Sequence, residues 1–274
     1  MLATQDTTGG TAQAADTLTR HDQHGRYPQA ETVDDFRHNL ATVQARMAAA
    51  CRRAGRDPAS VRLLPVSKTK PESSLRLAHA AGCRMLGENK VQEAFGKWEA
   101  MQDLADLQWS VIGHLQTNKA KLVARFASEF QALDNLRVAE ALDRRLQAEG
   151  RALDVFVQVN TSGEASKYGL PPDEVQGFLQ ALPAFSALRV RGLMTLALFS
   201  SEAERVRQCF VLLRSLRDQL RQARRRASRW MNCPWACPAT SRSPSRKAPP
   251  WCAWARPSSR PRPAGQLLLA RRRP

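Results

Sequence analysis

The chain lacks any run of about eighteen consecutive apolar residues, so its sequence predicts no transmembrane helix. Residues 1–30 lack the apolar core of a signal peptide, so export is not expected. Cysteine is scarce, with 6 residues among 274, too few for a disulfide scaffold at this length. These absences favour a cytoplasmic protein with one large domain or two small ones.

Acidic residues are missing from the end of the chain, where the last one is Asp218. The net charge of +17 comes from 42 basic and 25 acidic residues, and residues 221–274 hold 14 of the basic ones. The first 220 residues therefore carry 28 basic against 25 acidic residues. The same final segment holds 9 of the 16 prolines and 4 of the 6 tryptophans. The basic charge thus belongs to a C-terminal tail of different composition.

Hydrophobic periodicity divides the rest of the chain. Residues 1–30 show none and are expected to form a disordered extension. Apolar side chains then recur every three or four positions from Val33 to Met47, which predicts a helix that ends near Gly55.

Short apolar runs then alternate with longer amphipathic stretches. Strands are expected at 61–67, 83–87, 109–113, 130–134, 154–160 and 189–195, and helices at 72–81, 91–101, 117–127, 136–149, 171–182 and 202–220. This alternation predicts an α/β fold. No G-x-G-x-x-G fingerprint follows a strand, which favours a (β/α)₈ TIM-type barrel over an open sheet. About six βα units leave that barrel incomplete, so we expect it to span residues 31–220 and an irregular tail to follow at 221–274.

The expected strands end in short polar segments, where parallel α/β folds place their functional residues. Partial burial of Lys68 there would lower its pKa, because desolvation disfavours the charged form, and a neutral amine attacks aldehydes to form a Schiff base. Taken singly, these residue types have ordinary explanations. Lys68 could simply point to water, His114 could be a hydrogen-bonded structural histidine, and Asn89 and Asn160 could be caps or turn residues.

Five motifs together outweigh those explanations: LLPVSKTKP (63–71), GENKVQEA (87–94), WSVIGHLQTNKAK (109–121), VQVNTSGEASKYGL (157–170) and RGLMTL (191–196). In order and spacing they resemble the pyridoxal phosphate homeostasis proteins, a single-domain family related to the alanine racemase barrel. The resemblance spans roughly residues 31–220. It implies a (β/α)₈ barrel that binds pyridoxal 5′-phosphate (PLP) at the carboxyl ends of its strands.

By the same resemblance, Lys68 would hold the cofactor as an internal aldimine. Asn89, His114 and Met194 fall in motifs that resemble those lining the cofactor pocket, and neither a metal site nor a catalytic residue is implied. The implied role is vitamin B6 homeostasis: holding PLP, limiting the free aldehyde and passing it to apo PLP enzymes, without turnover of its own. We expect a monomer with no specific nucleic-acid partner and no membrane partner.

Two other functions stay open. A PLP-dependent amino-acid racemase would place Lys68 on one face of its substrate and a tyrosine on the other. The chain has only Tyr27 and Tyr168, and it has no room for the second β domain of racemases. A basic nucleic-acid-binding protein would bind through the arginine-rich tail. Truncation at residue 220 would then abolish nucleic-acid binding, which distinguishes this function from the others.

The tail has the properties of an out-of-frame reading. Family members continue with a segment resembling LSMGMSGDF, an acidic helix and VRxG, and these loops cradle the cofactor phosphate. A shifted codon consists of the third base of one residue's codon and the first two bases of the next residue's codon. Read in this way, residues 230–259 permit the sequence DELSMGMSGDFEIAIEEGATVVRVGQAIF. Trp230 followed by Met231 requires aspartate, for example. We therefore expect a frameshift, in the gene or in its sequencing, between about residues 220 and 229.

Overall fold

A computed structural model describes residues 30–164, 167–198 and 200–231, and the predicted α/β class is confirmed. Five parallel strands form one sheet in sequential order: β1 (Met85–Glu88), β2 (Gln108–Val111), β3 (Glu129–Leu133), β4 (Leu153–Gln158) and β5 (Leu188–Met194). Leu86 lies opposite Trp109, and Val155 lies opposite Val190. Helices connect consecutive strands: α4 (Val91–Ala100), α5 (Ala120–Phe126), α6 (Leu136–Ala148) and α7 (Val175–Ala181).

The first expected strand, at 61–67, is not a strand. A single parallel bridge joins Val66 to Gly87, with Ser67 N donating to Gly87 O and Gly87 N to Pro65 O. Pro65 has no N–H to extend this pairing. In the part of the chain that the structure describes, no strand pairs with the other side of this segment, and Val66 is 47% exposed. The sheet formed by the described residues therefore has one strand fewer than predicted.

The predicted N-terminal helix is confirmed as α2 (Val33–Arg53). It starts with a capping box: the Thr32 hydroxyl accepts from Asp35 N, and the Asp35 carboxylate accepts from Thr32 N. It ends before Gly55, whose φ is +60°.

The last described helix, α8 (Ala203–Met231), extends beyond the predicted end at residue 220. The expectation of irregular chain from residue 221 is thus wrong for 221–231. Arg, Gln and Ala, which favour helices, predominate there, and the first proline after Arg221 is Pro234. The expectations for residues 1–29 and 232–274 lie outside the described residues.

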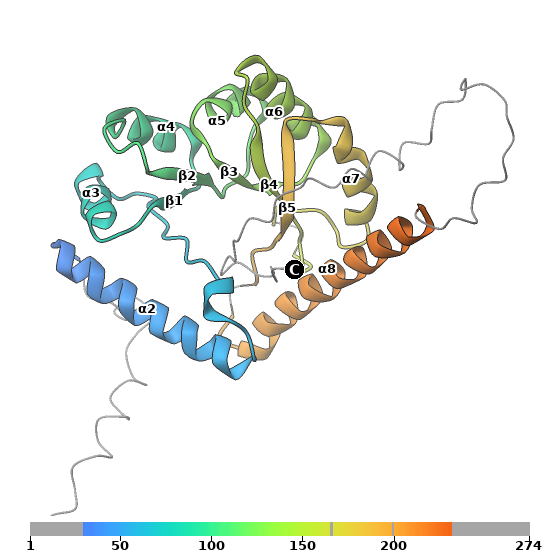
Figure 1. The fold of residues 1–274 in the computed structure, drawn as a ribbon, viewed down its shortest axis with the longest axis horizontal. Helices are drawn as coiled ribbons and strands as arrows, with labels where there is room; N and C mark the ends of the chain where they lie inside the picture. Colours follow the sequence, from blue (N-terminus) through green and yellow to red (C-terminus); the bar gives the residue numbers. More distant parts are fainter. Residues whose placement is uncertain (1–29, 165–166, 199, 232–274) are drawn as a thin grey trace, which may run out of the picture.

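The hydrophobic core lies mainly between the sheet and α3 (Glu72–Ala80) to α7, which arch over one face of the sheet (Figure 1). Helices α2 and α8 are drawn below the sheet, away from α4, α5 and α6 (Figure 1). Phe36 and Leu40 of α2 pack against the core, and α8 packs against β5 and buries Leu213. None of the helices described is both long and apolar enough to span a membrane.

Candidate functional site

The polar segments singled out in the sequence share one edge of the sheet, because all five strands are parallel and these segments follow their carboxyl ends. Two of the loops touch directly. A Cβ added to Gly113 would lie 2.2 Å from the carbonyl oxygen of Asn89, so only glycine lets these backbones approach so closely. This contact brings the predicted Asn89 and His114 segments together.

Lys68 lies in a tight turn beside the end of β1. Lys70 N donates to Ser67 O at 3.1 Å, and Thr69 has a φ of +61°, the pattern of a turn that usually places glycine at its third position. The Lys68 side chain is exposed, and its ammonium has no hydrogen-bond partner among the described residues. The expectation of partial burial is wrong here, because the side chain lies exposed on the turn.

Four residues form a polar network beneath this turn: Ser67 and Glu88, which are buried, and Glu93 and Lys97, which are partly exposed. We call it the Lys97 cluster. The Lys97 ammonium donates to Ser67 O at 2.8 Å, and to Oε1 of both Glu88 and Glu93 at 2.7 Å. The Ser67 hydroxyl also donates to Glu88 Oε1, at 2.6 Å. The Lys97 side chain is 11% exposed and that of Glu88 is 1% exposed, so the Lys97 ammonium is paired with protein groups rather than solvated by water.

Through Glu93 the cluster also contacts the backbone that follows Lys68. Glu93 Oε1 accepts from Thr69 N at 2.8 Å. The pKa of the Glu93 carboxyl is held below its ordinary value, first by the hydrogen bond from Lys97 and then by that from Thr69 N. A β-branched residue in the left-handed region costs about 1–2 kcal/mol, and such strain persists only where the surroundings enforce it.

The sequence alone did not identify this cluster. A signal was present, because Glu93 and Lys97 are four residues apart on a predicted helix, the spacing of a stabilising ion pair. That spacing indicates a surface pair on one helix. It does not show that Ser67 and Thr69, from a different segment, complete it.

His114 lies at the end of β2, as predicted, between an aromatic ring and a carboxylate. Its ring stacks on Tyr168, with centroids 4.0 Å apart and planes at 12°. Its Nδ1 is 3.8 Å from Asp134 Oδ2, close enough for a charge interaction but too long for a hydrogen bond. Tyr168 is 59% exposed, so this stacked pair faces solvent.

The ends of β4 and β5 are joined by buried hydroxyls. Thr161 Oγ1 and Thr195 Oγ1 are 2.8 Å apart, and Thr195 Oγ1 donates to Val159 O at 2.7 Å. Asn160 holds the loop after β4, donating to Glu164 O at 2.9 Å and accepting from Ser162 N at 3.2 Å, which is the turn role. Met194 is 1% exposed and belongs to the core.

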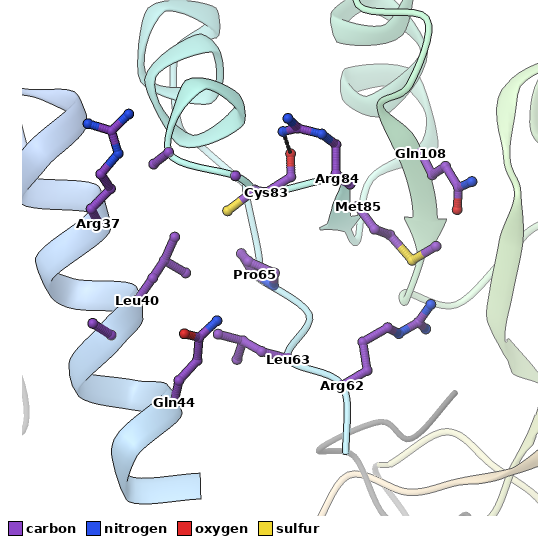
Figure 2. A pocket seen from close by; sticks show the side chains of 13 residues that line it. Arg37, Leu40, Gln44, Arg62, Leu63, Pro65, Cys83, Arg84, Met85 and Gln108 are labelled. Atoms are coloured by element: carbon purple, nitrogen blue, oxygen red, sulfur yellow. Dashed lines mark hydrogen bonds between the residues drawn. The ribbon is translucent and has the colours of Figure 1, made fainter. Parts of the chain in front are cut away.

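A cavity of about 410 Å³ lies at the opposite edge of the sheet, between α2 and the start of β1 (Figure 2). Leu40 and Gln44 of α2 line one side, and Leu63 and Pro65 line another. Its three arginines are already engaged: Arg37 pairs with Asp34, Arg62 donates to Glu129 and Arg84 pairs with Asp106. The cavity and the polar loops are therefore separate features. Within the described ranges, no group of three or more His, Cys, Asp or Glu residues could hold a metal ion.

Comparison of the chain with known proteins identifies the family to which it is similar. Residues 32–257 match the family described as alanine racemase, N-terminal domain. A pyridoxal phosphate homeostasis protein of Pseudomonas aeruginosa is 43% identical over 178 residues, which is 65% of this chain and 77% of that protein. Its counterpart in Escherichia coli K12 is 42% identical over 178 residues, 64% and 75% of the two chains. The structure of PipY from Synechococcus elongatus, with PLP bound, matches with a TM-score of 0.57 at 33% identity, covering 66% of this chain and 82% of that one.

Proposed function

Because this chain belongs to the pyridoxal phosphate homeostasis proteins, within the alanine racemase N-terminal domain family, we propose that it binds PLP as a Schiff base on Lys68. In this role it holds the cofactor and limits the concentration of free aldehyde inside the cell. The observation that carries the proposal is the Lys68 side chain, exposed and without a partner among the described residues at the carboxyl edge of a parallel sheet.

The described residues fit the aldehyde end of such a cofactor. An aldehyde supplies an electrophilic carbon, which a neutral lysine amine attacks with loss of water. Lys68 offers an amine group, and the turn that carries it is held from below by the Lys97 cluster. Asn89 and His114 lie on the loops at the same edge and are proposed to line the pocket. Met194, at the end of β5, is proposed to support it from the core. The resemblance places the phosphate-holding loops after α8, in the segment that we expect to be out of frame and that lies outside the described residues.

An exposed lysine suits a carrier better than an enzyme. A carrier must release its cofactor, and a lysine open to solvent would leave the bound cofactor within reach of an acceptor protein. We accordingly propose apo PLP enzymes as acceptors, a cytoplasmic location and a monomer. Racemisation would need a second acid or base across the substrate, and Tyr168, the one tyrosine among the described residues, is stacked on His114.

The experiment is to mix the protein with PLP, follow the visible absorbance of the Schiff base, reduce it with borohydride and map the adduct by peptide mass spectrometry. We expect one adduct, on Lys68, and none in Lys68→Ala at unchanged thermal stability. Lys121→Ala, an exposed lysine on α5, is the matched control and should retain the adduct. An adduct on Lys167 or Lys119 that persists in Lys68→Ala would overturn the assignment.

A further inference from the structure

We propose that Glu93 and Lys97 are positioning residues: they hold the strained 67–70 turn so that the Lys68 amine lies at the carboxyl edge of the sheet. This inference rests on the proposed function, because it assigns Lys68 the Schiff base. It adds that side chains of α4 hold the backbone on both sides of Lys68 without forming a hydrogen bond to its amine.

The first step in the argument is the conformation of Thr69. Among the described residues, it is the one non-glycine residue with a positive φ, at +61°. It is also β-branched, and such side chains avoid this region unless neighbouring contacts hold them there. The turn therefore requires an external restraint.

The second step is the position of the restraint. The cluster holds one peptide group on each side of Lys68: Ser67 O accepts from Lys97, and Thr69 N donates to Glu93. Both charged residues project from α4, and Glu88 ties them to the end of β1. The turn is thus attached at two points to regular secondary structure.

The third step concerns charge. The single Lys97 ammonium pairs with both Glu88 and Glu93, and no member of the cluster bonds to the Lys68 ammonium in the part of the chain that is described. Glu88 Oε2 is buried and has no hydrogen-bond partner among the described residues. A purely structural tie between α4 and β1 would need neither the contact to Thr69 N nor a strained residue at that point.

The test uses full-length protein and four variants. Glu93→Ala removes the contact to Thr69 N from a partly exposed site, and Glu93→Gln keeps an acceptor there. Glu99→Ala, on an exposed position of the same helix, is the control. The double variant Glu93→Ala/Thr69→Gly removes the contact but supplies a residue that adopts the positive φ unaided.

Two quantities are measured: hydrogen exchange of the 67–70 amides without PLP, and the rate constant for forming the borohydride-trapped Lys68 adduct. We expect Glu93→Ala to expose the Thr69 amide to exchange and to slow adduct formation on the order of tenfold, because misplaced reacting groups lose their orientation. Glu93→Gln should retain most of the rate, Glu99→Ala all of it, and the double variant should recover it to within about twofold.

Two outcomes overturn the inference: a Glu93→Ala rate equal to that of the unmodified protein, or a double variant as slow as Glu93→Ala. The thermal midpoints of all variants identify any loss that comes from unfolding. If the unmodified protein forms no Lys68 adduct at all, the proposed function fails and this inference fails with it. If that adduct forms but Glu93→Ala has no effect, the inference alone fails.

Discussion

At the scale of single residues, Gly113 shows how one missing side chain lets two loops of the site meet. A methyl group there would overlap the Asn89 carbonyl, 2.2 Å away, and backbone moves aside less easily than a flexible side chain. We expect Gly113→Ala to lower the free energy of unfolding by about 1–3 kcal/mol. Urea denaturation measures it.

Gly177 provides the matched control. It lies within α7, and an added Cβ would have no atom within 4 Å. Gly177→Ala should therefore raise the free energy of unfolding by about 0.5–1 kcal/mol, the gain of alanine over glycine in a helix. Equal effects of the two substitutions would contradict the close contact at Gly113.

Glu93 is expected to make the stability of the protein depend on pH. The pKa of its carboxyl is lowered by the hydrogen bonds from Lys97 and Thr69 N. Such a group stabilises the fold fully above its unfolded pKa, about 4.3, and loses that contribution as the pH falls through the lower folded value. We expect the stability difference between the unmodified protein and Glu93→Gln to be constant from about pH 7 to 5 and to shrink below about pH 4. Denaturant titrations at stepped pH test this, and a difference that stays constant to about pH 3 would contradict it.

At the scale of elements, the contact between α8 and β5 joins the last described helix to the sheet. Leu213 is fully buried there, whereas its neighbour Leu212 is 42% exposed. Leu213→Ala should lower the free energy of unfolding by about 2–5 kcal/mol, because it leaves a cavity in the core. Leu212→Ala should change it by no more than about 0.5 kcal/mol. Chemical denaturation of both variants measures the difference, and similar losses would show that α8 does not pack as described.

At the scale of the whole molecule, the described sheet has two edges, beside Val66 and along β5, where Val190 is 37% exposed. Exposed edges and apolar surface favour aggregation. We propose that the in-frame reading of residues 230–259 would supply two further strands and the loops that hold phosphate. A chain with the present reading is then expected to be poorly soluble.

That proposal predicts a difference in cofactor affinity. Phosphate is usually held by several backbone N–H groups, and each charge-assisted hydrogen bond contributes about 1.5–3 kcal/mol, or roughly tenfold or more in affinity. A chain carrying the decoded segment should bind PLP orders of magnitude more tightly than this one, whose residual binding should weaken with salt. Side-by-side PLP titrations and thermal melts of the two chains test this, and equal affinity with equal melting temperature would contradict it.

The sequence by itself determined the features that depend on local pattern. The apolar stripe of α2, the alternation of five strands with helices, and the motif that places Lys68 after a short apolar run are all readable within a few residues of chain. Periodicity suffices there because a helix or a strand repeats its buried side at a constant interval. The length of α8 was misjudged because a change of composition at residue 221 was taken for a change of structure.

Only the tertiary structure decided what depends on partners distant in the chain. The segment 61–67 has the composition of a strand, but among the described residues it is paired only through the bridge from Val66 to Gly87. Glu93 and Lys97 have the spacing of an ordinary helical ion pair, and their contacts to Ser67 and Thr69 exist because α4 packs beside the end of β1. Burial and non-local hydrogen bonds are properties of surfaces that meet only when the chain folds, so no local pattern encodes them.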